Sequence, residues 1–206
     1  MSTHHQTIEH IVLLNVKPDV DATKAAAIID EINGLASLGL TIHLSVGKLL
    51  RSTSTSLNFS HIVHGRFKST DDLQAYNHHP EHMRVAGILH PIVDDFVVVD
   101  WVSNSICDSL TPGYVMCVTL LKLKDGLDEN EKSKLVEEVK SLFKTSEQVS
   151  IGENFSREMG KGYSIAMSVV FPDLDTLGLD VVSKNLHESK VKEFIDSEVV
   201  VDYVAP

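Results

Sequence analysis

The stretch FSHIVHGRFKSTDDL, residues 59–73, has a counterpart in YSIAMSVVFPDLDTL, residues 163–177, which begins 104 positions later. The two stretches align without a gap and share a phenylalanine, an aspartate and a leucine at the same offsets. FVVVDW at residues 96–101 and EVVVDY at residues 198–203 agree in the same way. A period of this length indicates a duplicated domain, because the units of solenoid repeats are only about 20–50 residues long.

Strands and helices are predicted in the same order in both copies. In the first copy, strand patterns lie at residues 8–16, 40–50, 59–67 and 96–101. Residue types that favour the first turn of a helix stand at Asp21, at Ser69 with Asp72, and at Pro80. The second copy has a capping-box pattern at Asp128 and Glu131. The order βαββαβ is typical of a ferredoxin-like α+β domain, a four-stranded antiparallel sheet with helices on one face.

The two copies are predicted to be domains at residues 1–103 and 114–206, joined by a Ser-, Pro- and Gly-rich linker at residues 104–113. Strand valines are expected to make the helix-free face of each sheet apolar, among them Val12, Val63, Val97 and Val99. Two such faces can bury each other in a closed barrel, which also removes exposed strand edges. We therefore predict a dimeric α+β barrel within one chain. The chain is then a monomeric pseudo-dimer, or a homodimer if each half pairs with a neighbouring chain.

Composition disfavours several classes of partner. The formal net charge is −11 over 206 residues, and nucleic-acid phosphates attract clustered lysine and arginine instead. No stretch approaches the ~20 apolar residues that a bilayer span needs, and the first residues do not form a signal-peptide pattern. Cys107 and Cys117 are expected to be reduced thiols. These features predict a cytoplasmic protein, and the final VAP is unlike a peroxisomal targeting tripeptide.

The quoted stretches carry a family resemblance. EHIVLLNVK, SHIVHGRFKSTDDLQAYNHHPEH and FVVVDW resemble the stress-response A/B barrel domain, a dimeric α+β barrel family of plants and bacteria. The first copy is similar to it along its whole length. Two copies in one chain resemble the tandem plant members associated with stress and antifungal defence. The resemblance therefore implies a plant stress-response or defence protein, with antifungal activity as one expected role and a ligand-sized cavity in the first domain.

One family member, the polyketide cyclase olivetolic acid cyclase, implies site residues by resemblance. The first copy has histidines or a tyrosine at the matching positions, namely His10, His61, Tyr76 and His82. Tyr76 and His82 are the expected catalytic pair, while His10, His61 and His79 are the expected substrate-binding residues. Aldol closure of a poly-β-ketone needs a base for a carbon-bound proton and a donor to the developing alkoxide, which histidine and tyrosine supply. The resemblance implies no cofactor and no metal.

Three functions stay open at this point: a defence protein without an assigned reaction, a cofactor-free polyketide cyclase, and a non-catalytic carrier of a lipid-like or aromatic ligand. The second copy has Cys117, Ile165 and, by alignment, Asp180 where the first has the cyclase residues, so at most one pocket is expected to work. By strand alternation His61 points to the apolar side, where Tyr76 or His10 is a candidate hydrogen-bond partner. The structural alternative is that these histidines only complete the core.

Overall fold

The computed structural model describes residues 6–54, 57–103, 110, 112–143, 149–171, 173–174 and 181–206, with the backbone alone for residues 181–183. Most of the predicted linker lies outside these ranges, as do Cys107 and Asp180. The first half contains β1 (Thr7–Val16), α1 (Ala22–Gly34), the 3-10 helix η1 (Leu35–Leu38), β2 (His43–Thr53), β3 (His61–Phe67), α2 (Thr70–His78), α3 (Pro80–Leu89), η2 (His90–Ile92) and β4 (Val93–Ser103). The second half contains β5 (Val115–Leu123), α4 (Glu129–Leu142), β6 (Val149–Glu153), β7 (Tyr163–Phe171), α5 (Val181–Glu188), η3 (Lys190–Phe194) and β8 (Ile195–Val204).

The helix starts follow the predicted caps. The Asp21 carboxylate accepts hydrogen bonds from the first backbone N–H groups of α1, and the Ser69 hydroxyl accepts one from the backbone N–H of Asp72 in α2. Asp128 and Glu131 form the complete capping box of α4. Each cap satisfies backbone donors that have no partner within the helix.

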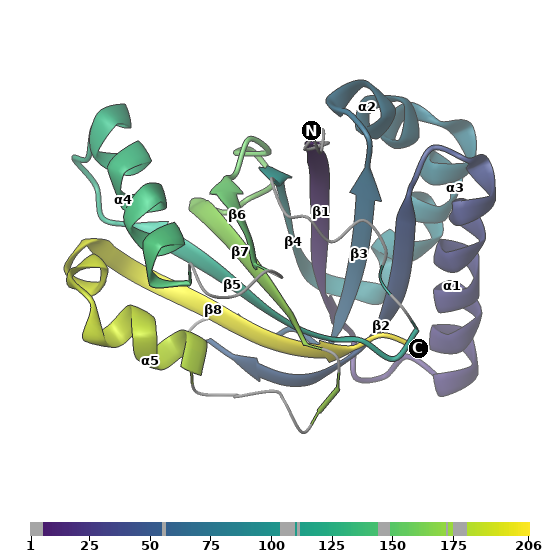
Figure 1. The fold of residues 1–206 in the computed structure, drawn as a ribbon. Coiled ribbons are helices and arrows are strands. Elements are labelled where there is room, and N and C mark those ends of the chain that lie inside the picture. Colours follow the sequence, from purple (N-terminus) through teal and green to yellow (C-terminus); the bar gives the residue numbers. More distant parts are fainter. Residues whose placement is uncertain are drawn as a thin grey trace.

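The strands form one eight-stranded antiparallel sheet in the order β4-β1-β3-β2-β8-β5-β7-β6. The halves join where β2 pairs with β8, and they meet again where β4 contacts the loop that follows β6. There, the Val98 N–H donates to the Met159 carbonyl at 3.1 Å and the Phe155 N–H donates to the Asp100 carbonyl at 2.9 Å. Helices α1, α2 and α3 cover one outer face and α4 and α5 cover the other (Figure 1). The predicted fold, two ferredoxin-like halves closed on each other within one chain, is confirmed.

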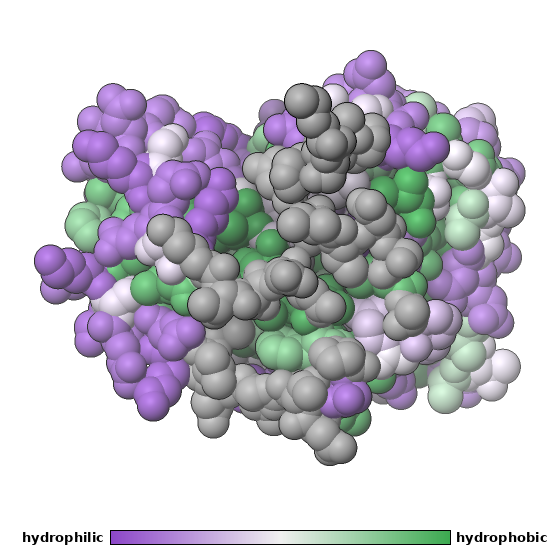
Figure 2. Space-filling model, viewed as in Figure 1, coloured by the Kyte–Doolittle hydropathy of each residue, from purple (hydrophilic) through white to green (hydrophobic). Residues whose placement is uncertain are grey.

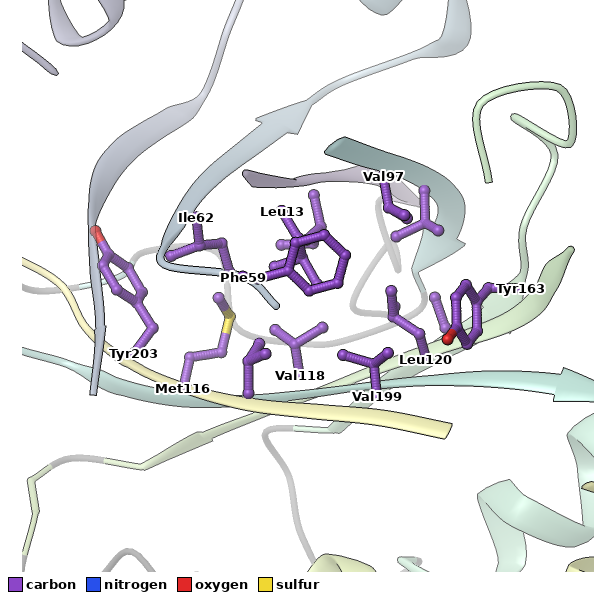
Figure 3. Close-up of a cluster of buried hydrophobic side chains, with 14 of the residues drawn as sticks. Leu13, Phe59, Ile62, Val97, Met116, Val118, Leu120, Tyr163, Val199 and Tyr203 are labelled. Carbon is purple, nitrogen blue, oxygen red and sulfur yellow. The ribbon is translucent and has the colours of Figure 1, made fainter. Parts of the chain in front are cut away.

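The inner faces of the two halves form the central core. Leu13 and Ile62 of the first half point toward Met116 and Val118 of the second, and all four side chains are fully buried (Figure 3). Burying such a side chain contributes roughly 1.5–3 kcal/mol relative to leaving it exposed. Hydrophilic residues cover the surface over α4, and apolar residues show mainly in the band between the halves (Figure 2). The second half therefore buries the apolar inner face of the first half's sheet.

One prediction about the sheet faces is half right. Val97 and Val99 face the central core as expected. The placement of Val12 and Val63 is wrong, because these paired residues lie on the helix side of the sheet. Side chains alternate along a strand, so Val12 must share the face of Leu14, which packs under the helices. Both valines therefore line a cavity on the helix side of the sheet.

Candidate functional site

A cavity of about 490 Å³ lies in the first half, between the outer face of the sheet and helices α1, α2 and α3. Most of its wall is aliphatic, contributed by strands and helices alike. Its lining comprises His10, Val12, Leu14, Ile32, Leu35, Val63, Tyr76, Asn77, His78, His82, Val85, Ala86, Leu89, His90, Val93, Phe96, Val98 and Met159. An apolar cavity with a few polar groups is the usual form of a small-molecule site, and the volume falls in the usual range of about 300–1,000 Å³.

Tyr76 and His82 face each other in this wall. Tyr76 lies in the last turn of α2 and His82 in the first turn of α3. The break between the helices brings their ring centroids to 4.6 Å. Burial raises the pKa of the Tyr76 phenol to about 12, so it stays protonated and can donate at neutral pH. The His82 Nδ1 lies 3.1 Å from the Asn77 carbonyl oxygen. A carbonyl only accepts, so Nδ1 carries the proton and Nε2 keeps its lone pair.

Burial also sets the charge of His82. It lowers the pKa of the imidazole below its ordinary value; the hydrogen bond to Asn77 opposes this effect, and the nearby His10 and His79 add to it. His82 is therefore neutral near pH 7, in the form that can accept a proton. The pair offers one donor and one base to whatever occupies the cavity.

The imidazole of His10 is hydrogen-bonded to the carboxylate of Asp100. His10 lies opposite Asp100 in the β1–β4 ladder, and its Nδ1 is 2.6 Å from Asp100 Oδ1, with both side chains buried. Its ring also packs edge-on against Tyr76, with centroids 6.4 Å apart. Because a carboxylate accepts, Nδ1 carries a proton and Nε2 is the nitrogen left for a ligand. No sequence motif marks Asp100 as a site residue, although it stands in the FVVVDW stretch.

The structure brings together three of the five predicted site residues, namely His10, Tyr76 and His82. Among the described residues of the cavity lining, neither His61 nor His79 is present. His61 is buried, and its Nδ1 pairs with the Ser60 hydroxyl at 2.9 Å instead of with Tyr76 or His10. His79 caps α3, its Nδ1 accepting from the Glu81 N–H at 3.2 Å. The lining adds His78 and His90, which the resemblance did not assign.

The second half has apolar packing at the positions that match His10 and His61. Cys117 and Ile165 lie in an apolar cluster with Val139 of α4 and Leu186 of α5. Burial raises the pKa of the Cys117 thiol to about 12, so it remains protonated. Asp202 is the counterpart of Asp100, and it pairs with Arg51 Nε of the first half at 2.5 Å. In the part of the second half that the structure describes, the predicted loss of the cyclase residues goes with a packed interior.

A second polar cluster, which no sequence motif indicates, is buried between the halves. Glu9 Oε2 is 2.8 Å from His64 Nε2 and Glu9 Oε1 is 2.8 Å from Arg66, all three side chains being nearly or fully inaccessible. His64 Nδ1 is 2.8 Å from the Tyr114 hydroxyl, which also lies 3.0 Å from His43. Tyr114 comes from the second half, so this Glu9 cluster ties the halves together. Its members face the inside of the barrel, away from the 490 Å³ cavity.

The Glu9 cluster makes stability depend on pH. Burial, followed by the charges of His64 and Arg66, lowers the pKa of His43 to about 3, and burial also lowers that of His64. A histidine whose pKa is depressed by folding binds its proton first in the unfolded chain. Its stabilising contribution is complete above about pH 6.5 and is lost as pH falls toward the folded pKa.

We therefore expect the free energy of unfolding to fall below pH 6.5, each such histidine adding at most about 1.4 kcal/mol per pH unit. Urea unfolding at pH 7.5, 6.5, 5.5 and 4.5 measures this slope. His43→Gln should reduce it, because one titrating group is removed. A free energy of unfolding that stays flat between pH 6.5 and 4.5 would contradict the expectation.

Metal binding has little support in the geometry. Among the described residues, no group of three or more His, Cys, Asp and Glu side chains has the arrangement of a metal site. His78 and His82 are four positions apart, but His78 is the last residue of α2 and His82 lies in α3, so they do not share one helical face as two zinc ligands at this spacing would. The same described part of the chain has no helix long and apolar enough to cross a membrane.

Comparison with known proteins decides the family. The family model of the stress-responsive A/B barrel domain matches the chain twice, at residues 8–103 and 117–205. The chain belongs to this family. One stress-response A/B barrel domain-containing protein of Arabidopsis thaliana is 39% identical, with 98% of this chain and 80% of that protein aligned. A second such protein, also of Arabidopsis thaliana, is 34% identical over 97% of each protein. The predicted family and its two-copy arrangement are thus confirmed.

Solved structures agree with this A/B barrel fold over the whole chain. A protein assigned as a chlorite dismutase has a TM-score of 0.62 at 10% identity, covering 98% of this chain and 95% of its own. A Fusobacterium nucleatum protein assigned as a monooxygenase has a TM-score of 0.59 at 11% identity, covering 99% of this chain and 94% of its own. At these identities the likeness concerns the fold of the A/B barrel alone.

Proposed function

We propose that the first A/B barrel domain binds a small, mainly apolar ligand that carries a carbonyl or phenolic oxygen, such as an aromatic or polyketide compound. The observation that carries this proposal is the 490 Å³ cavity with Tyr76, His82 and His10 in an otherwise largely aliphatic wall. Apolar walls supply affinity by removing ligand surface from water, and the few polar groups select an oxygen-bearing ligand. In the described part of the second half, Cys117 and Ile165 lie in an apolar cluster, which favours the first half as the place of the site.

A second candidate is cofactor-free aldol closure of a poly-β-ketone in the same cavity. The observation that favours it is the neutral His82, with its Nε2 lone pair, beside a protonated Tyr76 phenol. In such a reaction His82 takes a proton from the carbon between two carbonyls, and that carbon bonds to a second carbonyl carbon. The resulting alkoxide accepts a hydrogen bond from Tyr76 and then receives the proton from the His82 imidazolium. Atoms and charge balance without an oxidant or metal.

We propose that the stress and defence role of the A/B barrel family depends on this cavity. We place antifungal activity, where it occurs, downstream of ligand capture or conversion. Inhibition of fungal growth that survives in a folded Tyr76→Phe/His82→Gln double variant would move that activity to another surface.

A histidine NMR titration with a resorcylic-type aromatic acid tests the binding proposal. We expect the signals of His10 and His82 to shift with the acid, while those of His43 and His64, on the other side of the sheet, stay in place. Tyr76→Phe and His82→Gln should each weaken binding about three- to tenfold, since each removes one hydrogen-bonding group from the cavity. Equal shifts at all four histidines, or no shift at millimolar acid, would reject the site.

A further inference from the structure

We propose that the second domain is a working part of the first domain's site: Ser156, in the loop after β6, positions Asp100, which in turn positions His10 in the cavity wall. Nothing in the resemblance or the sequence comparison assigns a role to Ser156. The inference rests on the proposed ligand site for its effect on affinity, and on the geometry alone for its effect on His10.

Asp100 is held on both carboxylate oxygens by different halves of the molecule. Its Oδ1 accepts from His10 Nδ1 in the first half at 2.6 Å, and its Oδ2 accepts from the Ser156 hydroxyl in the second. Asp100 is only 1% exposed, so these protein groups replace the water that a carboxylate would otherwise bind. Fixing both oxygens fixes the plane of the carboxylate, and with it the ring of His10.

The loop that carries Ser156 is itself fixed to β4. The Asn154 side-chain oxygen accepts from the backbone N–H of Asp100 at 3.0 Å and from that of Ser156 at 2.9 Å. Its amide nitrogen donates to the Tyr163 carbonyl at 2.9 Å, and Asn154 is buried. The backbone bond from Phe155 to Asp100 completes the attachment. These hydrogen bonds fix the position of Ser156 relative to Asp100.

The same loop also supplies part of the cavity wall. Met159 lines the cavity, and its carbonyl accepts from the Val98 N–H, beside the stretch that holds Asp100. The second domain thus contributes to the site twice, once through apolar contact and once through the Ser156–Asp100–His10 chain. An isolated first domain would lack both contributions.

The counterpart of the Ser156–Asp100 contact in the second half is the Arg51–Asp202 ion pair. In the second half Asp202 pairs with Arg51 from the first half, so each half lends one group to the aspartate of the other. Cys117 stands where His10 stands in the first half, and it lies in a packed apolar cluster. Only the Asp100 contact therefore leads to a histidine and a cavity. The second domain can lose its own site and still be needed for the first.

The test compares Ser156→Ala with Arg51→Gln, its counterpart on the other aspartate, and with Ser156→Thr, which restores a hydroxyl. The first measurement is the His10 Nδ1 proton and nitrogen resonance in the ligand-free protein, and the second is affinity for the resorcylic-type acid. We expect Ser156→Ala to shift or broaden the His10 resonance and to weaken binding about three- to tenfold. Arg51→Gln and Ser156→Thr should leave both close to wild type.

The outcomes separate this inference from the proposed function. An unchanged His10 resonance in Ser156→Ala, or an equal change in Arg51→Gln, would overturn the positioning role whether or not the acid binds. A changed resonance confined to Ser156→Ala supports it even if the wild-type protein fails to bind the acid, in which case only the ligand proposal fails. Thermal unfolding of each variant shows that the compared proteins are folded.

Discussion

Replacing Arg66 by methionine is expected to lower the free energy of unfolding by about 3–5 kcal/mol. The guanidinium of Arg66 lies 2.8 Å from Glu9 Oε1, and neither side chain has appreciable access to water. Burial by itself would raise the pKa of Glu9, but His64 and Arg66 together lower it, so the carboxylate is ionised in the folded protein. Removing its cationic partner leaves a buried charge without compensation, which costs more than the pair gains.

A double variant shows whether the lost free energy comes from that charge. Glu9→Gln/Arg66→Met should recover a large part of it, because an amide carries no charge and its oxygen can still accept from His64 Nε2. Urea unfolding at pH 7.5 measures both variants. A loss below about 1 kcal/mol in Arg66→Met, or no recovery in the double variant, would show that the Glu9 cluster is not a tightly coupled buried ion pair.

The fold was predictable because its signals are local or periodic. Asp21, Ser69 and Asp128 cap helices through atoms only two or three residues away, and strand alternation together with the internal repeat fixes the order of elements. The same alternation also contains the correction for Val12, since it shares a face with Leu14 and His10. Pattern alone does not say which face of a two-sided apolar sheet meets the helices, and packing decides it.

Sequence spacing predicted the site only where one segment carries it, and His10 of β1 was assigned by resemblance alone. Tyr76 and His82 lie six positions apart, on two helices joined by a short break, so their meeting follows from the local sequence. His61 was assigned to the cavity by resemblance, but its Nδ1 pairs with the Ser60 hydroxyl. Asp100 and Ser156 come from different halves, and their contact depends on how the barrel closes. No spacing in the sequence reports such a contact.

Substituting Val12 by phenylalanine is expected to abolish most ligand binding, lowering affinity by well over tenfold. Val12 pairs with Val63 in β3 and with Val98 in β4, and these three residues form the middle of the strand side of the cavity. A phenyl ring at this position occupies volume that the ligand needs. Because the ring buries apolar surface within the cavity, the free energy of unfolding should stay the same or rise, at roughly 25 cal/mol for each Å² of apolar surface buried.

Val102→Phe provides the matched control, since Val102 is also in β4 but is 38% exposed and lies apart from the lining. Calorimetric titration of both variants with the resorcylic-type acid should show binding lost only for Val12→Phe, with thermal unfolding confirming that each is folded. The affinity and the free energy of unfolding together distinguish a filled cavity from a damaged fold. A general loss of structure lowers both, whereas a filled cavity lowers affinity alone. Wild-type affinity in a folded Val12→Phe protein would place the ligand elsewhere and leave the cavity as a packing defect beneath α1 and α3.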